Sequence, residues 1–262
     1  MDYKKLLDGK RAFITTGARG IGFGIAKLFA EQGAQIILGG RSKPGLEKAI
    51  EEILKISPRS KSYLVDMSDE AALNSTCSTI LSENGGIDIL VNVVGVNRRS
   101  PIHEYKDDDL EFLLGTNYKS ALICMKHFIP GMIKQGYGNI IQISSIHGSQ
   151  TMPGFGLYAG TKGALNAVTR AAALDYAENG IRVNTISPGL IMSDMMLDEV
   201  NSFPEGKQRD DFLKLLEGMQ PLAPGKVADI ANTALFLASE MSAYITGQTI
   251  LVDGGATIKA HP

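Results

Sequence analysis

Tyr158 and Lys162 stand four positions apart, and Ser145 lies thirteen residues before the tyrosine. On a helix, residues at i and i+4 share a face, so the phenol and the ammonium group would lie together. A phenol has an unperturbed pKa of about 10 and transfers protons poorly at neutral pH unless a cation lowers that pKa. We expect Lys162 to have this effect and Ser145 to hydrogen-bond the same substrate oxygen. The same Tyr and Lys spacing also occurs in ordinary surface pairs.

A glycine-rich loop near the N-terminus indicates a dinucleotide site. The run Thr15-Thr16-Gly17-Ala18-Arg19-Gly20-Ile21-Gly22 follows a predicted strand and precedes a predicted helix. Glycines in this position let a pyrophosphate approach the helix N-terminus, where free N–H groups favour anions. A tight turn without a ligand gives the same pattern. The predicted cofactor contacts in the loop are Thr16, Arg19, Gly20, Ile21 and Gly22.

The second predicted strand ends in Gly39-Gly40-Arg41-Ser42, about twenty residues beyond the loop. An NAD-binding unit places Asp or Glu here to bind the ribose hydroxyls, and this chain has no acid at that point. Arg41 can instead pair with the 2′-phosphate of NADP, and Arg19 could reach the same phosphate. The sequence therefore predicts NADP(H) rather than NAD(H).

Short aliphatic or β-branched runs alternate with segments whose apolar residues have helical spacing. The seven predicted strands are 12–15, 35–38, 62–65, 87–91, 139–143, 182–186 and 249–252. Nearly continuous apolar strands separated by helices indicate a parallel sheet covered on both faces. We expect one Rossmann-like, doubly wound α/β domain over residues 1–262, with a mobile lid at 193–225 and a long helix that starts at Asp107-Asp108-Asp109.

Composition excludes several other classes of protein. The 262 residues hold 26 Lys plus Arg and 28 Asp plus Glu, a net charge of −2, so we expect neither nucleic acid nor an anionic membrane as a partner. Cys77 and Cys124 lack metal-ligand or disulfide spacing, and the four histidines are scattered, so no metal site is predicted. The charged N-terminus and the lack of a long apolar run favour a cytoplasmic protein.

Further motifs add to the loop and the Tyr and Lys pair. They are Asp66, Asn92-Val93-Val94-Gly95, Asn117, Pro188-Gly189 and Val252-Asp253-Gly254-Gly255. Together with Ser145 and Tyr158-Ala-Gly-Thr-Lys162, they make the chain resemble the short-chain dehydrogenase/reductase family from about Lys10 to Gly255.

The resemblance implies roles for particular residues. Tyr158 would be the acid or base and would also contact the cofactor, and Lys162 would lower the pKa of Tyr158 and hold the nicotinamide ribose. Ser145 would bind the substrate oxygen, and Asn117 would support a relay water. Asp66, with Met67 beside it, would lie at the adenine, and Asn92 and Gly95 would line the cofactor cleft. The nicotinamide would be flanked by Pro188, Gly189, Ile191 and Ser193. The Tyr and Lys spacing of four favours reduction of a carbonyl group over a carbon–carbon double bond.

Two positions depart from the family pattern. Thr16 stands where the first glycine of the loop is usual, with Gly17 one place later, which affects the expected geometry of the turn. Val93-Val94 replaces the usual Asn-Ala, which is expected to narrow the cleft and removes one side-chain amide.

The substrate is expected to be a secondary alcohol or its ketone. Arg98 and Arg99 follow the fourth strand, and Arg99 could bind a carboxylate bidentately. The two arginines and the Gly-Gly-Ala-Thr-Ile-Lys tail are similar to gluconate 5-dehydrogenases and related sugar-acid dehydrogenases. Both arginines could equally be solvated surface residues.

Alternatives to a sugar-acid dehydrogenase stay open. The run rich in Met and Leu within 193–225 would suit a steroid or bile acid as substrate, so a hydroxysteroid dehydrogenase is the second hypothesis. The same run could instead pack a lid or a subunit contact. A non-catalytic NADP-binding redox sensor is the alternative from another class. The family resemblance also implies a homotetramer, formed through helices around 110–135 and 157–177 and the C-terminal strand.

Overall fold

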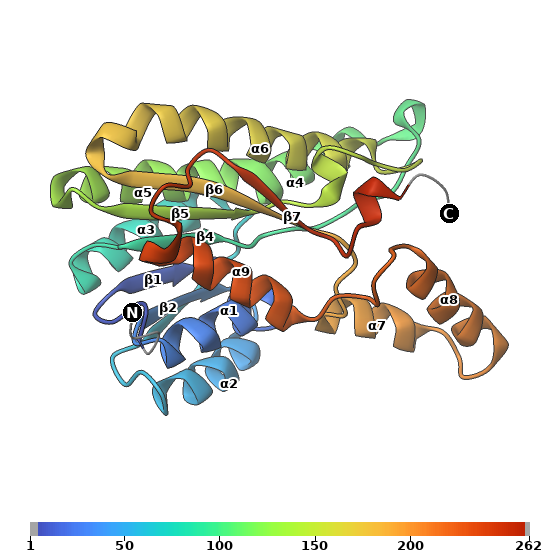
Figure 1. The fold of residues 1–262 in the computed structure, drawn as a ribbon, viewed down its shortest axis with the longest axis horizontal. Helices are drawn as coiled ribbons and strands as arrows, with labels where there is room; N and C mark the ends of the chain where they lie inside the picture. Colours follow the sequence, from blue (N-terminus) through green and yellow to red (C-terminus); the bar gives the residue numbers. More distant parts are fainter. Residues whose placement is uncertain (1–4, 260–262) are drawn as a thin grey trace.

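A seven-stranded parallel sheet forms the centre of the protein in this computed structural model, which describes residues 5–259. In sheet order, the strands are β3 (Lys61–Leu64), β2 (Gln35–Gly40), β1 (Arg11–Ile14), β4 (Ile89–Asn92), β5 (Gly138–Ile143), β6 (Ile181–Pro188) and β7 (Thr249–Val252). The strand order reverses between β1 and β4, which both lie in the middle of the sheet (Figure 1). In doubly wound sheets, ligands bind beyond the carboxyl ends of the strands at such a reversal.

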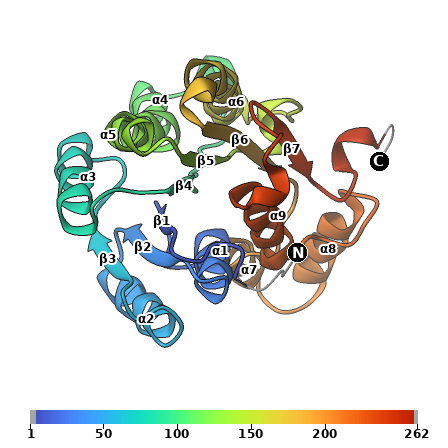
Figure 2. The ribbon, with the colours of Figure 1, turned by 60° about the vertical axis from the view of Figure 1, so that its left-hand side comes forward.

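Helices cover both faces of this sheet (Figure 2). One face carries α1 (Gly20–Glu31), α2 (Lys43–Leu54) and α9 (Val227–Ala238). The other carries α3 (Glu70–Asn84), α4 (Asp107–Leu114), α5 (Ser120–Gln135) and α6 (Gly156–Tyr176). The predicted doubly wound α/β class is confirmed.

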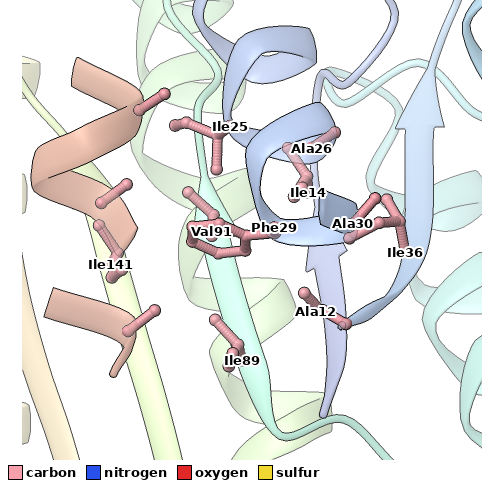
Figure 3. Packing of buried hydrophobic residues seen from close by; sticks show 14 of the residues in the cluster. Ala12, Ile14, Ile25, Ala26, Phe29, Ala30, Ile36, Ile89, Val91 and Ile141 are labelled. Carbon is pink, nitrogen blue, oxygen red and sulfur yellow. The ribbon is translucent and has the colours of Figure 1, made fainter. Parts of the chain in front are cut away.

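Alternation along the strands explains why their sequences are almost wholly apolar. In β1, Ala12 and Ile14 enter the core beneath α1 and α9, whereas Phe13 points to the opposite face and packs edge-on against Phe128 of α5. Successive side chains of a strand point to opposite faces, so a strand buried on both faces needs apolar residues at every position. Figure 3 shows the first of these cores, in which Phe29 of α1 lies over the sheet.

Two segments differ from a plain series of strands and helices. The helix predicted to start at Asp107 is interrupted by a π-helical turn, Gly115–Lys119, between α4 and α5. Residues 193–225 form two helices, α7 (Asp194–Ser202) and α8 (Lys207–Gly218), which extend away from the sheet in Figure 1. We refer to 193–225 as the α7–α8 segment.

Candidate active site

A cavity of about 320 Å³ lies at the carboxyl ends of the central strands. Ten of the predicted cofactor contacts line it: Thr16, Arg19, Gly20, Ile21, Gly22, Arg41, Asp66, Met67, Gly95 and Ser193. The sequence analysis did not predict cofactor contacts for seven further lining residues: Gly40, Val65, Val93, Val94, Val96, Thr116 and Met195. Each of these residues lies within two positions of a predicted site residue in the sequence, and this proximity was the signal that could have identified it.

The glycine-rich loop brings main chain directly to the cavity. Gly20 has φ +58°, a left-handed conformation that favours glycine. A Cβ on Gly22 would collide with the main-chain oxygen of Thr16. Thr16 itself is not among the described residues with positive φ, so this turn does not need glycine at that position. The departure from the family pattern is therefore accommodated without backbone strain.

Charged side chains line the cavity near the ends of β2 and β3. Arg41 Nη1 lies 3.9 Å from Asp66 Oδ2, and Arg19 Nη1 lies 2.9 Å from Asp198 Oδ2. Burial alone would raise the pKa of Asp66, but hydrogen bonds from the main-chain N–H and hydroxyl of Ser68, with the charge of Arg41, lower it. Asp66 therefore remains ionised and holds its own loop in shape.

The serine and tyrosine of the predicted set come together where β5 ends and α6 begins. Ser145 Oγ accepts the main-chain N–H of His147 at 3.2 Å, so its own proton remains free for another acceptor. Burial raises the pKa of the Tyr158 phenol, and a hydrogen bond with Ser145 opposes that rise. In the protein alone the shift is thus opposite to the predicted lowering, because burial disfavours phenolate and the lysine does not offset it.

Lys162 lies beneath this pair and is almost fully buried, with 1% of its surface exposed. Its Nζ donates to the main-chain oxygens of Val94, at 3.1 Å, and Ile143, at 2.9 Å. The same nitrogen lies 5.7 Å from the centre of the Tyr158 ring. Because burial penalises the ammonium form, the pKa of Lys162 falls to about 7. The two hydrogen bonds thus fix the position of the Lys162 amine, and its pKa of about 7 allows it to gain or lose a proton near neutral pH.

Asn117 lies in the π-helical turn, which points its amide towards the β4 loop and α6. Its Nδ2 donates to Val96 O at 2.9 Å and to Thr161 Oγ1 at 3.1 Å, and its Oδ1 accepts the Val96 N–H at 2.9 Å. Both amide hydrogens are used in these contacts. The side chain therefore positions the loop after β4, and π-helical turns of this kind are frequent at functional sites.

Other predicted residues lie outside the cavity. Pro188 ends β6, and a Cβ on Gly189 would come within 2.7 Å of Asp253 Cα. Ile191 is buried and forms an isolated bridge with Gly225 that closes the base of the α7–α8 segment. Asn92 is 3% exposed, and neither atom of its amide has a hydrogen-bond partner among the described residues.

The two consecutive arginines point to different neighbours. Arg98 pairs with Asp109 of α4 at 3.4 Å and lies over the ring of Phe112. Arg99 lies 4.7 Å from the ring centre of Phe155, and its Nη2 is 3.9 Å from Glu199 of α7.

Phe155 connects Arg99 to the reacting side of the site. The ring of Phe155 stacks on His147 at 4.4 Å and meets Tyr158 edge-on at 6.3 Å. Burial, together with the charge of Arg99, lowers the pKa of His147, which keeps this imidazole neutral at pH 7. Of the two arginines, Arg99 is therefore the one that contacts a neighbour of the candidate catalytic tyrosine.

The residues present fit a dinucleotide. The cavity is lined by the glycine-rich loop and by Arg19 and Arg41, and Lys162 adjoins it through its hydrogen bond to the lining residue Val94. The unpartnered buried amide of Asn92, beside the cavity-lining Val93, is a further polar group that such a ligand could satisfy.

Comparisons with known proteins agree with this geometry. Residues 16–257 match the family described as enoyl-(acyl carrier protein) reductase. Over 253 residues, the chain is 31% identical to gluconate 5-dehydrogenase of Gluconobacter oxydans (strain 621H), with 96% of each protein covered. It is 34% identical to the 3-oxoacyl-(acyl-carrier-protein) reductase FabG of Thermotoga maritima, with 96% of this chain and 99% of that protein covered. The chain belongs to the short-chain dehydrogenase/reductase family.

A solved structure of the same fold covers the whole chain. L-sorbose reductase from Gluconobacter frateurii, complexed with NADPH and L-sorbose, superposes with a TM-score of 0.92 at 29% identity and covers 100% of both chains. As a short-chain dehydrogenase/reductase, the protein is an oxidoreductase that uses a nicotinamide dinucleotide, as predicted. No helix within residues 5–259 is both long and apolar enough to span a bilayer.

Proposed function

We propose that the protein interconverts a secondary alcohol and a ketone with NADP(H), and that its substrate is a sugar acid. The observation that carries the substrate class is the position of Arg99, whose guanidinium lies over Phe155 beside Tyr158. A guanidinium has a planar fork of donors that matches a carboxylate. A polyol acid held there by its carboxylate would have its hydroxyl groups close to the tyrosine.

NADP(H) is favoured by charge at the adenine end of the cavity. Arg19 and Arg41 both line it, and no acid follows β2 at the point where an NAD-binding unit needs one. The similarity to a sorbose reductase that was solved with NADPH supports the same choice.

The proposed chemistry uses few groups of this chain. When bound, the cofactor accepts or supplies the hydride at the substrate carbon. Ser145 donates to the substrate oxygen, and Tyr158 takes the hydroxyl proton during oxidation or returns it during reduction. Lys162 is fixed by Val94 and Ile143, and in its ammonium form it would place a positive charge near the phenol and favour the phenolate. Asn117 holds the β4 loop against α6, and support of a relay water remains its proposed role.

The test compares the two adjacent arginines. Initial rates are measured with NADPH and NADH for 5-ketogluconate, an oxo bile acid and an acetoacetyl thioester, and in reverse for gluconate. We expect NADPH-dependent turnover of the sugar acids, with Arg99→Ala raising KM by about 10- to 100-fold and leaving kcat within about threefold, the loss of one bidentate charged contact. Arg98→Ala is the matched control and should change KM by less than about twofold because Arg98 pairs with Asp109.

Two outcomes would overturn this proposal. Equal turnover with NADH and NADPH would contradict the proposed preference for NADP(H). An unchanged KM for the sugar acid in Arg99→Ala would contradict the proposal that Arg99 binds the substrate carboxylate.

A hydroxysteroid dehydrogenase is the second candidate, and one observation favours it. The α7–α8 segment exposes a group of large apolar side chains: Met195 61%, Leu197 42%, Leu215 63%, Met219 37% and Leu222 68%. Met195 also lines the cavity. If this segment is the substrate lid, it offers an apolar surface to a bulky ligand. Turnover of the bile acid that is insensitive to Arg99→Ala would support this candidate instead.

We further propose that the protein is a homotetramer. Leu174 of α6 is 82% exposed, and Leu251 is 45% exposed on β7, one of the two edge strands of the sheet. An unpaired strand edge and exposed aliphatic side chains are typical of surfaces that pair with another chain. Light scattering after size-exclusion chromatography tests the assembly, and a monomer at micromolar concentration would refute it.

A further inference from the structure

One face of α7 lies against the glycine-rich loop. Asp194 and Asp198 are four residues apart and so share a face of the helix. Asp194 Oδ2 accepts the main-chain N–H of Gly20 at 2.8 Å, and Asp198 Oδ2 lies 2.9 Å from Arg19 Nη1. The two contacts join segments that are 174 to 179 residues apart in sequence.

Arg19 therefore already has an anionic partner at the place where the cofactor phosphate is expected. The other arginine, Arg41, is held less closely, at 3.9 Å from Asp66. A carboxylate and a phosphate monoester bind the same fork of guanidinium N–H groups. Asp198 and a 2′-phosphate would thus compete for Arg19.

We propose that Asp198 sets how strongly the protein prefers NADP(H) over NAD(H). This inference rests on the proposed function, because it takes Arg19 to be a ligand of the 2′-phosphate. NADP(H) must break or share the contact between Asp198 and Arg19, whereas NAD(H) carries no phosphate there and leaves it intact. The carboxylate consequently weakens the binding of NADP(H) and has little effect on NAD(H).

The contact is suited to a role in selectivity rather than in stability. The side chains of Arg19 and Asp198 are 64% and 67% exposed, and exposed ion pairs contribute little to folding. Removal of the Asp198 charge should therefore leave the fold intact. Cofactor preference would then depend on the α7–α8 segment as well as on the loop that follows β2.

The experiment measures dissociation constants for NADPH and NADH without substrate, by titration of the cofactor fluorescence. The variants are Asp198→Asn, Arg19→Ala and the double variant, and thermal unfolding confirms that each is folded. Glu205→Gln is the matched control, since it removes the same charge from the same segment at a side chain that pairs with Arg209 and is 95% exposed.

We expect Asp198→Asn to lower the Kd for NADPH by about three- to tenfold and to change that for NADH by less than about twofold. Glu205→Gln should change neither constant by more than about twofold. In the Arg19→Ala background, Asp198→Asn should no longer lower the Kd for NADPH, because Asp198 weakens NADPH binding only by occupying Arg19.

An unchanged or raised Kd for NADPH in Asp198→Asn would overturn the inference, as would equal tightening of NADH or a gain that persists without Arg19. The proposed function fails in a different way, namely if the wild-type protein binds NADH as tightly as NADPH. A wild-type preference for NADPH that Asp198→Asn leaves unchanged would refute only the role of Asp198.

Discussion

Two parts of the candidate site hold their charged groups in opposite ways. One is the floor, which we define as Ser145, Tyr158 and the buried Lys162, and the other is the α7–α8 segment. On the floor, Lys162 is 1% exposed and bound to two main-chain oxygens. On the segment, Asp198 is two-thirds exposed and bound to another exposed side chain. A buried group has one allowed position and a shifted pKa, whereas an exposed pair is screened by water and exchanges partners at low cost.

This difference separates chemistry from selectivity within one site. Groups that must hold or move a proton lie where the backbone of β4, β5 and α6 fixes them. Groups that choose among ligands lie where a substitution has little effect on folding. The same division makes distinct predictions for substitutions in the two regions.

The largest effect is expected on the floor, from Tyr158→Phe. Loss of the phenolic proton should lower kcat by about 10²- to 10⁴-fold, the usual contribution of a general acid or base. The Kd for NADPH should stay within about threefold, because the cavity-lining residues are untouched. Stopped-flow and steady-state rates measure the first quantity, and fluorescence titration the second. A kcat within tenfold of wild type would show that the proton moves through another group.

A pH-dependent stability is expected from Lys162. Its pKa is about 7 in the folded protein and about 10.4 when unfolded, so the unfolded chain binds more protons between these values. The free energy of unfolding should therefore rise with pH from about 7 to 9, by an amount on the order of 2 kcal/mol. Urea unfolding of the cofactor-free protein across this range measures the slope.

Lys162→Met should flatten that slope, since it removes the group that titrates. Lys27→Met, at an exposed position on α1, is the control and should keep the wild-type slope. Equal slopes in the wild-type protein and Lys162→Met would contradict an uncharged buried lysine at high pH.

The smallest effect is expected on α7, from Glu199→Gln. Glu199 lies 3.9 Å from Arg99, so its carboxylate competes with that of a sugar acid for the same guanidinium. The KM for the sugar acid should fall by about two- to fivefold, in keeping with an exposed pair. Steady-state kinetics test this, with Glu205→Gln as the reference for a charge lost elsewhere on the segment. A raised KM would mean that Glu199 orients Arg99 and does not compete with the substrate.

Local sequence was enough to predict much of the fold. The seven strands were predicted because each is a short apolar run, and both faces of the sheet need apolar residues. The observed strand limits differ from the predicted ones by at most two residues, as at β4, which was expected at 87–91 and spans Ile89–Asn92. The π-helical turn around Asn117 left no signal, since its residues continue an ordinary helical pattern.

The residue types and spacings by themselves determined the chemistry available to this protein. A glycine-rich loop after a strand, the missing acid after β2 and the Tyr158 and Lys162 pair can all be read within short stretches of chain. Tertiary structure alone decided which groups meet and how they are charged. It bonded Lys162 to residues 94 and 143, raised the pKa of Tyr158 in the protein alone, separated Arg98 from Arg99 and brought Asp198 to Arg19. These contacts join residues distant in sequence, and burial and pKa depend on the packing of whole elements.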